Sequence, residues 1–248
     1  MKPAMLITGA SRGIGAATAR LAARNGHPVC INYRTGAEQA GQIASDIEAS
    51  GGRAVTVEAD MAKEADIIAM FDACDEAFGP LGGLVNNAGI TGHISRVEDL
   101  DRDTLEHLLA VNVIGPFVCA REAVKRMSTR HGGHGGTIVN VSSRASELGS
   151  PNEFVHYAAS KGAIDSFTIG LAREVAGEGI RVNAVNPGLI DTEIHARAGS
   201  PDRLERLLPG VPMARIGSAD EVAETILWLM SDAASYVTGI TVPISGGR

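Results

Sequence analysis

Cysteine is scarce in this chain of 248 residues. Cys30, Cys74 and Cys119 lie far apart in the sequence, and each is surrounded by apolar residues. This spacing matches neither a disulfide framework nor the closely spaced ligands of a structural zinc site. The three residues are therefore expected to be buried thiols in a reducing compartment, which predicts a cytoplasmic protein.

Positive charge is also in short supply, since 22 lysines and arginines face 29 aspartates and glutamates and give a net charge of −7. An acidic surface repels nucleic acid and anionic membranes, so neither is expected as a general partner, although a local basic pocket remains compatible with this balance. No apolar run is expected to reach the roughly 20 residues of a membrane-spanning helix. The first residues lead directly into a predicted strand, so no export signal is expected.

The chain has no internal repeat, linker or low-complexity tail, and its length suits one domain covering residues 1–248. Short runs rich in Val and Ile alternate with longer helical patterns. The predicted strands are 4–8, 29–32, 54–58, 83–86, 137–141, 181–185 and 240–243, and the main predicted helices are 14–25, 37–50, 64–78, 104–127 and 155–176. Apolar strands of this kind are typical of parallel sheets covered by helices on both faces. The pattern predicts an α/β fold with a doubly wound, seven-stranded parallel sheet.

A glycine-rich turn joins the first predicted strand to the first helix. Its sequence is Thr8-Gly-Ala-Ser-Arg-Gly-Ile-Gly15. Glycines let the backbone turn tightly and approach a pyrophosphate, whose charge is met by the amides at the helix N-terminus. Three glycines alone are weak evidence, but their place between a strand and a helix is the context that a dinucleotide requires. The turn therefore predicts cofactor contacts from Gly9, Ser11, Arg12, Gly13, Ile14 and Gly15.

No carboxylate ends the second predicted strand, where an enzyme selecting NAD usually places an acid for the adenosine ribose. The segment reads Ile31-Asn-Tyr-Arg34, so Arg12 and Arg34 would offer two cations to a 2′-phosphate. This favours NADP(H), with NAD(H) use left open because either arginine could equally be a solvated surface charge. At the end of the third strand, Asp60 could accept a bond from the adenine amino group or cap the next helix. The predicted contacts at this end of the cofactor are Asn32, Tyr33, Arg34, Asp60 and Met61.

Tyr157 and Lys161 are four residues apart in Tyr157-Ala-Ala-Ser-Lys161, so they share one face of a predicted helix. A nearby lysine favours the phenolate and lowers a tyrosine pKa that is ordinarily about 10 toward the range of general acid–base catalysis. The spacing is common by itself. It becomes specific beside three other motifs at strand ends, which are Asn86-Asn-Ala-Gly89, Ser142-Ser143 and Pro187-Gly188. All of them are expected at the carboxyl edge of the sheet, facing one crevice.

With these residues assembled, the chain resembles the classical short-chain dehydrogenase/reductase family over essentially its whole length. The resemblance implies a Rossmann fold and an oxidoreductase that interconverts an alcohol and a carbonyl. It implies that Tyr157 is the catalytic acid–base, that Lys161 binds the nicotinamide ribose, and that Ser143 polarises the substrate oxygen. Asn112 matches the asparagine that holds a water of the proton relay. The further cofactor contacts that the resemblance implies are Asn87, Ala88 and Gly89 near the adenosine, and Pro187, Gly188, Ile190 and Thr192 near the nicotinamide.

The resemblance also implies a homotetramer built on the two long helices, although Ser245 stands where relatives commonly have an aspartate. The charged segment 189–212, which lacks a predicted strand, is expected to be a substrate lid. No metal is expected, because His131 and His134 lie in a glycine-rich turn without a third ligand nearby.

The substrate is open between a small polar alcohol or ketone, as in bacterial sugar dehydrogenases, and a 3-oxoacyl thioester on an acyl-carrier protein. Polar groups for the first are Glu147, Asn152, Glu153, His156, Glu193 and His195. Cations for the second are Arg126, Arg130 and Arg173, although such charges are usually a solvated helix face. A non-catalytic dinucleotide-binding regulator is the rival from another class, and the set of Asn112, Ser143, Tyr157 and Lys161 argues against it.

Overall fold

The sheet has the predicted architecture. The computed structural model describes residues 2–194, 199–200 and 202–248. Seven parallel strands follow the order β3-β2-β1-β4-β5-β6-β7, so the chain fills one half of the sheet before it returns to the other side of β1. The strands are β1 (Ala4–Ile7), β2 (Val29–Tyr33), β3 (Ala54–Glu58), β4 (Leu81–Asn86), β5 (Gly136–Val141), β6 (Ile180–Pro187) and β7 (Thr241–Ile244). Where the order reverses, between β1 and β4, a crevice is expected at the carboxyl ends of the strands.

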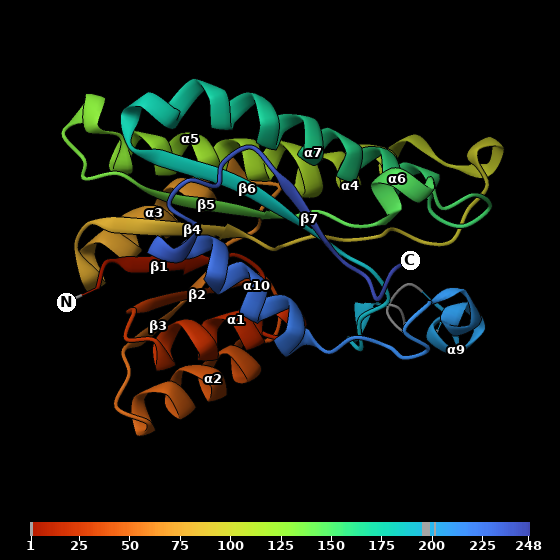
Figure 1. Cartoon of the computed structure of the whole chain (residues 1–248), viewed down its shortest axis with the longest axis horizontal. Helices are drawn as coiled ribbons and strands as arrows, with labels where there is room; N and C mark the ends of the chain where they lie inside the picture. Colours follow the sequence, from red (N-terminus) through yellow and green to blue (C-terminus); the bar gives the residue numbers. More distant parts are fainter. Residues whose placement is uncertain (1, 195–198, 201) are drawn as a thin grey trace.

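Helices cover both faces of the sheet (Figure 1). One layer contains α1 (Gly13–Arg24), α2 (Ala37–Ala49) and α10 (Ala219–Met230), and the other contains α3 (Glu64–Phe78), α5 (Gly115–Met127) and α7 (Val155–Val175). A hydrophobic core lies between the sheet and each helix layer. Neighbouring residues of a strand belong to different cores, as Leu6 and Ile7 do in β1. Because alternate side chains of a strand point to opposite faces, each strand is apolar on both sides.

Within the described residues, the sequence patterns missed three α-helices that follow the later strands. Helix α10 supplies the crossover that parallel strands β6 and β7 need. Its start carries a capping box, in which Ser218 Oγ accepts from the Glu221 N–H while the Glu221 carboxylate accepts from the Ser218 N–H. The short helices α6 (Ala145–Leu148) and α9 (Arg203–Leu207) both lie on the right-hand side of Figure 1, toward the carboxyl end of the sheet.

The predicted helix 104–127 is continuous but not uniform. It consists of α4 (Arg102–Leu109), a π-helical turn (Ala110–Ile114) and α5. By length and composition, Arg102–Met127 is apolar enough to cross a membrane, with a mean hydropathy of 1.3 in its most apolar window. Half of this apolar stretch is buried within the fold. Helix α5 packs on β4 and α3, as the core helix of a globular domain does.

The three cysteines are free thiols, each fully buried in the core on the α3 side of the sheet. Cys119 Sγ lies 3.8 Å from Met61 Sδ. Burial, and secondarily the charge of Glu122, raises the pKa of Cys119 to about 12. A hydrogen bond with Cys74, together with burial, raises the pKa of Cys30. Thiols in this state are poor nucleophiles.

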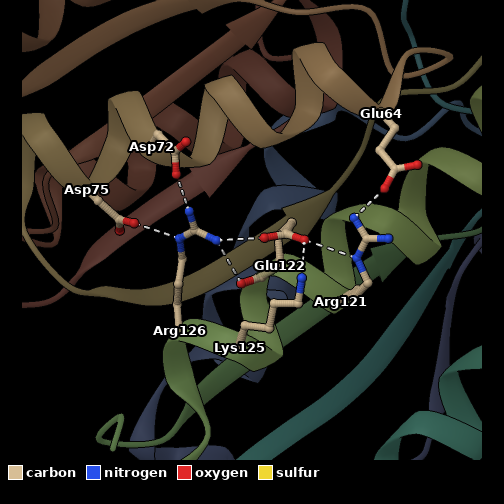
Figure 2. A network of polar contacts seen from close by, with 7 residues as sticks. All are labelled: Glu64, Asp72, Asp75, Arg121, Glu122, Lys125 and Arg126. Carbon is tan, nitrogen blue, oxygen red and sulfur yellow. Dashed lines mark hydrogen bonds and ion pairs between the residues drawn. The ribbon is translucent and has the colours of Figure 1, made fainter. Parts of the chain in front are cut away.

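A network of charged side chains joins α3 to α5 around the buried Glu122 (Figure 2). Glu122 Oε1 accepts from Lys125 Nζ at 2.9 Å and from Arg121 Nε at 3.0 Å, and Oε2 accepts from Arg126 Nη1 at 3.0 Å. Arg126 then crosses to α3, where its Nε donates to Asp75 at 2.6 Å. Burial alone would raise the pKa of Glu122, but the hydrogen bonds from its cationic neighbours outweigh burial and hold that pKa below its usual value.

Replacing Glu122 by glutamine is expected to destabilise the fold by about 2 kcal/mol, because the amide cannot balance the cations around a buried position. Since the folded-state pKa lies below the ordinary 4.5, the carboxylate stabilises the fold above that pH and loses this effect as the pH falls through the lowered pKa. Urea unfolding of the wild type and Glu122→Gln, at neutral pH and then at progressively lower pH, should show a difference that shrinks with acidity.

The control for this experiment is Glu98→Gln, in which the lost carboxylate is exposed and paired only with Arg96. This variant should change the unfolding free energy much less than Glu122→Gln does. Equal effects of the two substitutions would show that the network does not stabilise the fold.

Candidate functional site

A cavity of about 300 Å³ opens at the carboxyl ends of the strands, where the sheet order reverses. It brings together the predicted catalytic residues Ser143, Tyr157 and Lys161, but not Asn112. Of the predicted cofactor residues, only Gly15 is absent from its wall. Those that line it are Gly9, Ser11, Arg12, Gly13, Ile14, Asn32, Tyr33, Arg34, Asp60, Met61, Asn87, Ala88, Gly89, Tyr157, Lys161, Pro187, Gly188, Ile190 and Thr192.

The floor of the cavity is formed where the glycine turn meets the segment after β4. Gly9 has a φ of +62°, and a Cβ there would lie 2.9 Å from the Ala88 Cα, so only glycine permits this approach. Thr8 Oγ1 accepts from the N–H groups of Asn87 and Ala88, each at 3.0 Å. Gly15 lies behind this floor, since a Cβ there would come within 2.5 Å of Asn87 Nδ2. Its role is therefore to permit packing of α1 rather than to face the cavity.

Helix α1 presents its amino end to the cavity. Its N-cap residue, Arg12, makes no side-chain cap, and the first turn contains no acidic residue. The first N–H groups of a helix have no intrahelical acceptor, so this end favours an anion. The segment after β6 reaches across to it, because a Cβ at Gly13 would lie 3.3 Å from Thr192 Cγ2. This arrangement fits a diphosphate.

Two arginines, Arg12 and Arg34, lie near the carboxyl end of β2. The Arg12 guanidinium lies beside Gly36, where an added Cβ would be 2.8 Å from Nη2. Arg34 Nη1 lies 3.9 Å from Asp60 Oδ2, and Arg12 Nη1 lies 3.0 Å from Glu193 Oε2, whose side chain is 65% exposed. The strand itself ends without a carboxylate. A phosphate group here would meet two guanidinium groups.

Asn32 and Asp60 also order this end of the cavity. Asn32 Oδ1 accepts from the Gly9 N–H at 2.9 Å and Nδ2 donates to the Ala59 carbonyl at 3.1 Å, so the side chain ties the glycine turn to the end of β3. Asp60 Oδ1 accepts from the Ala62 N–H at 3.0 Å, just before α3. Asp60 does not cap α3, because the N-cap of that helix is Lys63 and it has no side-chain cap. The bond of Asp60 to adenine remains a prediction.

Tyr157 and Lys161 extend from α7 into the cavity wall, next to Ser143 at the end of β5. The Ser143 hydroxyl lies close enough to the Tyr157 side chain to lower its pKa, and it accepts from the Ala145 N–H at 3.1 Å. Lys161 Nζ donates to the Val141 carbonyl at 2.8 Å and lies 5.6 Å from the Tyr157 ring centroid. The three polar groups therefore converge on one wall.

The neighbouring serine is engaged elsewhere. Ser142 Oγ donates to the Lys161 carbonyl at 3.1 Å, and the residue is buried. This leaves Ser143 as the serine that reaches Tyr157, in agreement with the choice of the second serine.

The pKa of Tyr157 is raised rather than lowered. Burial raises it, while the Ser143 hydrogen bond and the charge of Arg203 oppose that effect. Burial also lowers the pKa of Lys161 to about 8, against the charge of Asp165. The expected lowering of the Tyr157 pKa by Lys161 is not found, because burial outweighs the groups that lower this pKa and Lys161 is not one of them. At neutral pH Tyr157 is a neutral phenol, suited to donating a proton.

Asn112 lies in the π-helical turn, behind the cavity wall and only 1% exposed. Its Nδ2 donates to the Ile90 carbonyl at 2.8 Å and to Ser160 Oγ at 3.1 Å, and its Oδ1 accepts from the Ile90 N–H at 2.9 Å. A Cβ at Gly89 would lie 3.4 Å from Asn112 Oδ1 and 3.5 Å from Lys161 Nζ. The side chain thus holds the segment after β4 against α7, and its part in a proton relay stays a prediction.

One end of the cavity was not anticipated from the sequence. Arg144 follows Ser143 directly, which is a local signal, whereas Arg203 and Arg248 come from α9 and from the segment after β7. The lining residues that were not predicted are Thr35, Ala59, Ile90, Thr91, Val111, Val141, Ser142, Arg144, Ala145, Leu148, Ser150, Phe154, Leu189, Ile194, Arg203 and Arg248.

The polar groups expected around the substrate require correction. Glu193 lines the cavity, and His195 lies outside the described residues. The expectation is wrong for Glu147, Asn152, Glu153 and His156, which are absent from the cavity wall. Each of them has another partner. Glu147 pairs with Arg144, and Asn152 accepts a hydrogen bond from Arg96. Glu153 pairs with Arg203 and Arg206, and the His156 ring is hydrogen-bonded to the Thr91 carbonyl.

The cations considered for a carrier protein do not face the cavity either. Arg126 belongs to the network around Glu122, Arg130 lies 3.5 Å from Glu178, and Arg173 is exposed on α7. Within the described part of the chain, no group of three or more His, Cys, Asp or Glu side chains is arranged to hold a metal.

Known proteins share this arrangement. A family model described as enoyl-(acyl carrier protein) reductase matches residues 9–248. The chain is 52% identical to an uncharacterized oxidoreductase, YgfF, of Escherichia coli, covering 98% of both chains. It is 36% identical to glucose 1-dehydrogenase 2 of Bacillus subtilis, covering 98% of this chain and 93% of that protein. It is 35% identical to the 3-oxoacyl-[acyl-carrier-protein] reductase FabG of Staphylococcus aureus, covering 100% of this chain and 98% of that protein.

A solved structure extends the likeness to three dimensions. The short-chain dehydrogenase of Burkholderia cenocepacia in complex with NADP superposes with a TM-score of 0.91 at 34% identity, over 99% of this chain and 97% of that one. Fold, motif order and similarity along the whole chain agree. The chain therefore belongs to the classical short-chain dehydrogenase/reductase family, whose members are oxidoreductases acting on CH–OH or carbonyl groups.

Proposed function

We propose that this oxidoreductase prefers NADP(H) and interconverts an alcohol and a carbonyl compound, with Tyr157 as the general acid–base. The observation that carries the proposal is the convergence of Ser143, Tyr157 and Lys161 on the wall of a cavity whose other end is cationic. A dinucleotide spanning this cavity would bring its nicotinamide to the tyrosine.

The residues present fit such a cofactor. The turn at Gly9 and the open amino end of α1 suit a diphosphate, and Arg12 and Arg34 suit a 2′-phosphate. A carboxylate that would favour NAD is missing from the end of β2. The match with a short-chain dehydrogenase crystallised with NADP supports the same assignment.

The chain's own groups divide the chemistry between them. The bound nicotinamide supplies or accepts the hydride. In the direction of reduction, the neutral Tyr157 hydroxyl gives its proton to the substrate oxygen, and the Ser143 hydroxyl donates a hydrogen bond to the same oxygen. Lys161, whose pKa is about 8, is mainly an ammonium at neutral pH and would bind the ribose hydroxyls. Asn112 positions Lys161 through the segment that carries Gly89.

The assembly is proposed to be a cytoplasmic homotetramer that uses α5 and α7. Both helices carry exposed apolar side chains, at Phe117 on α5 and Ile169 on α7, and Ile114 is exposed in the turn before α5. The rings of Phe117 and Phe167 stack with centroids 3.8 Å apart, which ties the two helices into one surface. Residues 189–212 are proposed as the substrate lid.

The experiment that tests the proposal is a steady-state assay of oxidation and reduction with NADP(H) and with NAD(H). The substrate panel contains sugars, polyols, ketones and a 3-oxoacyl thioester. Turnover that prefers NADP(H) is expected on at least one member, and turnover of the thioester would instead favour a reductase of the FabG kind. Tight NADPH binding without turnover of any compound would favour a dinucleotide-binding regulator.

A further inference from the structure

Three arginines line the end of the cavity that contains Tyr157 and Ser143. They are brought together from distant parts of the chain, with Arg144 before α6, Arg203 on α9 and Arg248 after β7. The whole protein carries a net charge of −7, so a cationic group of this kind runs against the average of the chain.

Two of these side chains are held in place. Arg144 Nε donates to the main-chain oxygen of Arg248 at 2.8 Å, and the Arg144 side chain is 17% exposed. Arg203 Nε donates to Glu153 at 3.0 Å, and its guanidinium lies over the buried Phe154 ring, 5.3 Å from the centroid. Guanidinium groups fixed in this way lose little conformational entropy when they bind an anion.

The three cations also act on one another. Burial lowers the pKa of Arg248, and the charges of Arg203 and Arg144 lower it further, against the opposite effect of Glu153. Mutual repulsion in a partly buried site is relieved when an anion binds.

The carboxylates that pair with these arginines do not line the cavity. Glu147 pairs with Arg144 and Glu153 pairs with Arg203, whereas the three arginines are among the residues that line it. Glu193 does line the cavity, but it pairs with Arg12 at the cofactor end.

We infer that the substrate is a small ketone or alcohol that carries a carboxylate or a phosphate. This anionic group is bound by Arg144, Arg203 and Arg248 while the carbonyl or hydroxyl oxygen meets Tyr157 and Ser143. The planar guanidinium matches carboxylate and phosphate oxygens with paired hydrogen bonds. The inference rests on the proposed function for the place of the reacting oxygen. It disfavours neutral sugars and polyols as the natural substrates.

The test compares substrates that differ only in charge. NADPH-dependent reduction is measured for acetoacetate against acetoacetamide, for levulinate against its primary amide, and for dihydroxyacetone phosphate against dihydroxyacetone. At least one anion should exceed its neutral partner in kcat/KM by about tenfold or more. The first two pairs test a carboxylate and the third tests a phosphate.

Variants then connect this preference to the arginines. Arg248→Gln and Arg203→Gln should each reduce the anion-to-neutral ratio of kcat/KM by about tenfold. The matched control is Arg102→Gln, since Arg102 is 86% exposed on α4 and pairs only with Glu106, and it should leave the ratio unchanged.

A binding measurement separates this inference from the catalytic proposal. Calorimetry with each anion and its neutral partner, on the wild type and Arg248→Gln in the presence of NADP⁺, reports the anion site without turnover. Binding that requires the negative charge and Arg248, but gives no product, would reject the catalytic proposal and keep the anion site. If no anion binds or reacts in preference to its neutral partner, the inference is overturned, even where neutral compounds are reduced.

Discussion

Tyr157→Phe is expected to lower kcat by about 10²–10⁴-fold, because the variant keeps the ring but loses the proton that the substrate oxygen must receive. The Ser143 hydroxyl would remain, so some stabilisation of the oxygen would persist. The dissociation constant of NADPH should change far less than kcat, since the phenyl ring still fills its place in the wall. Steady-state rates at saturating substrate and a fluorescence titration with NADPH measure the two quantities.

Tyr236→Phe is the matched control for this change. Tyr236 is fully exposed and does not line the cavity, so loss of its hydroxyl should leave both quantities unaltered. A Tyr157→Phe enzyme that retained most of its turnover would show that another group, or water alone, delivers the proton.

Replacing both Arg12 and Arg34 by glutamine is expected to raise the dissociation constant of NADPH by about a hundredfold while changing that of NADH much less. The two guanidinium groups are partly exposed, with side chains 25% and 51% accessible, so solvent weakens each contribution. The double change also removes the ion pairs with Glu193 and Asp60. Titration of the wild type and the double variant with both nucleotides gives the four constants required.

Arg20→Gln is the control, because Arg20 lies on α1 but points to Asp46 outside the cavity. Its loss should not affect the ratio of the two dissociation constants. An equal rise for NADH and NADPH in the double variant would mean that Arg12 and Arg34 bind the part common to both nucleotides. The preference for NADP(H) would then have no basis at the end of β2.

The sheet and the cofactor end could be predicted because their signals are local. Each apolar strand lies in one short run, and the glycine turn sits between its strand and its helix. The alternation of strands and helices then predicts parallel strands, and the carboxyl edge of such a sheet collects the motifs. Tyr157, Lys161 and Ser143 were placed correctly at the cavity for the same reason.

The substrate end could not be predicted because it depends on long-range packing. Arg203 and Arg248 reach the cavity only after α9 and the end of β7 have been placed in space. The acidic residues before α7 appeared suitable for a polar substrate, yet Glu153 is committed to Arg203 and Arg206. The Tyr157 pKa was misjudged because burial outweighs its neighbours, and no sequence spacing reports burial.

The buried cysteines give the protein a set of built-in unfolding probes. Cys30 belongs to β2, Cys74 to α3 and Cys119 to α5, so the thiols sample one strand and two helices that enclose the same hydrophobic core. A maleimide can reach them only when that core opens, and its rate of attachment at each position therefore measures the free energy of local opening. Different rates at the three positions would reveal which element separates first.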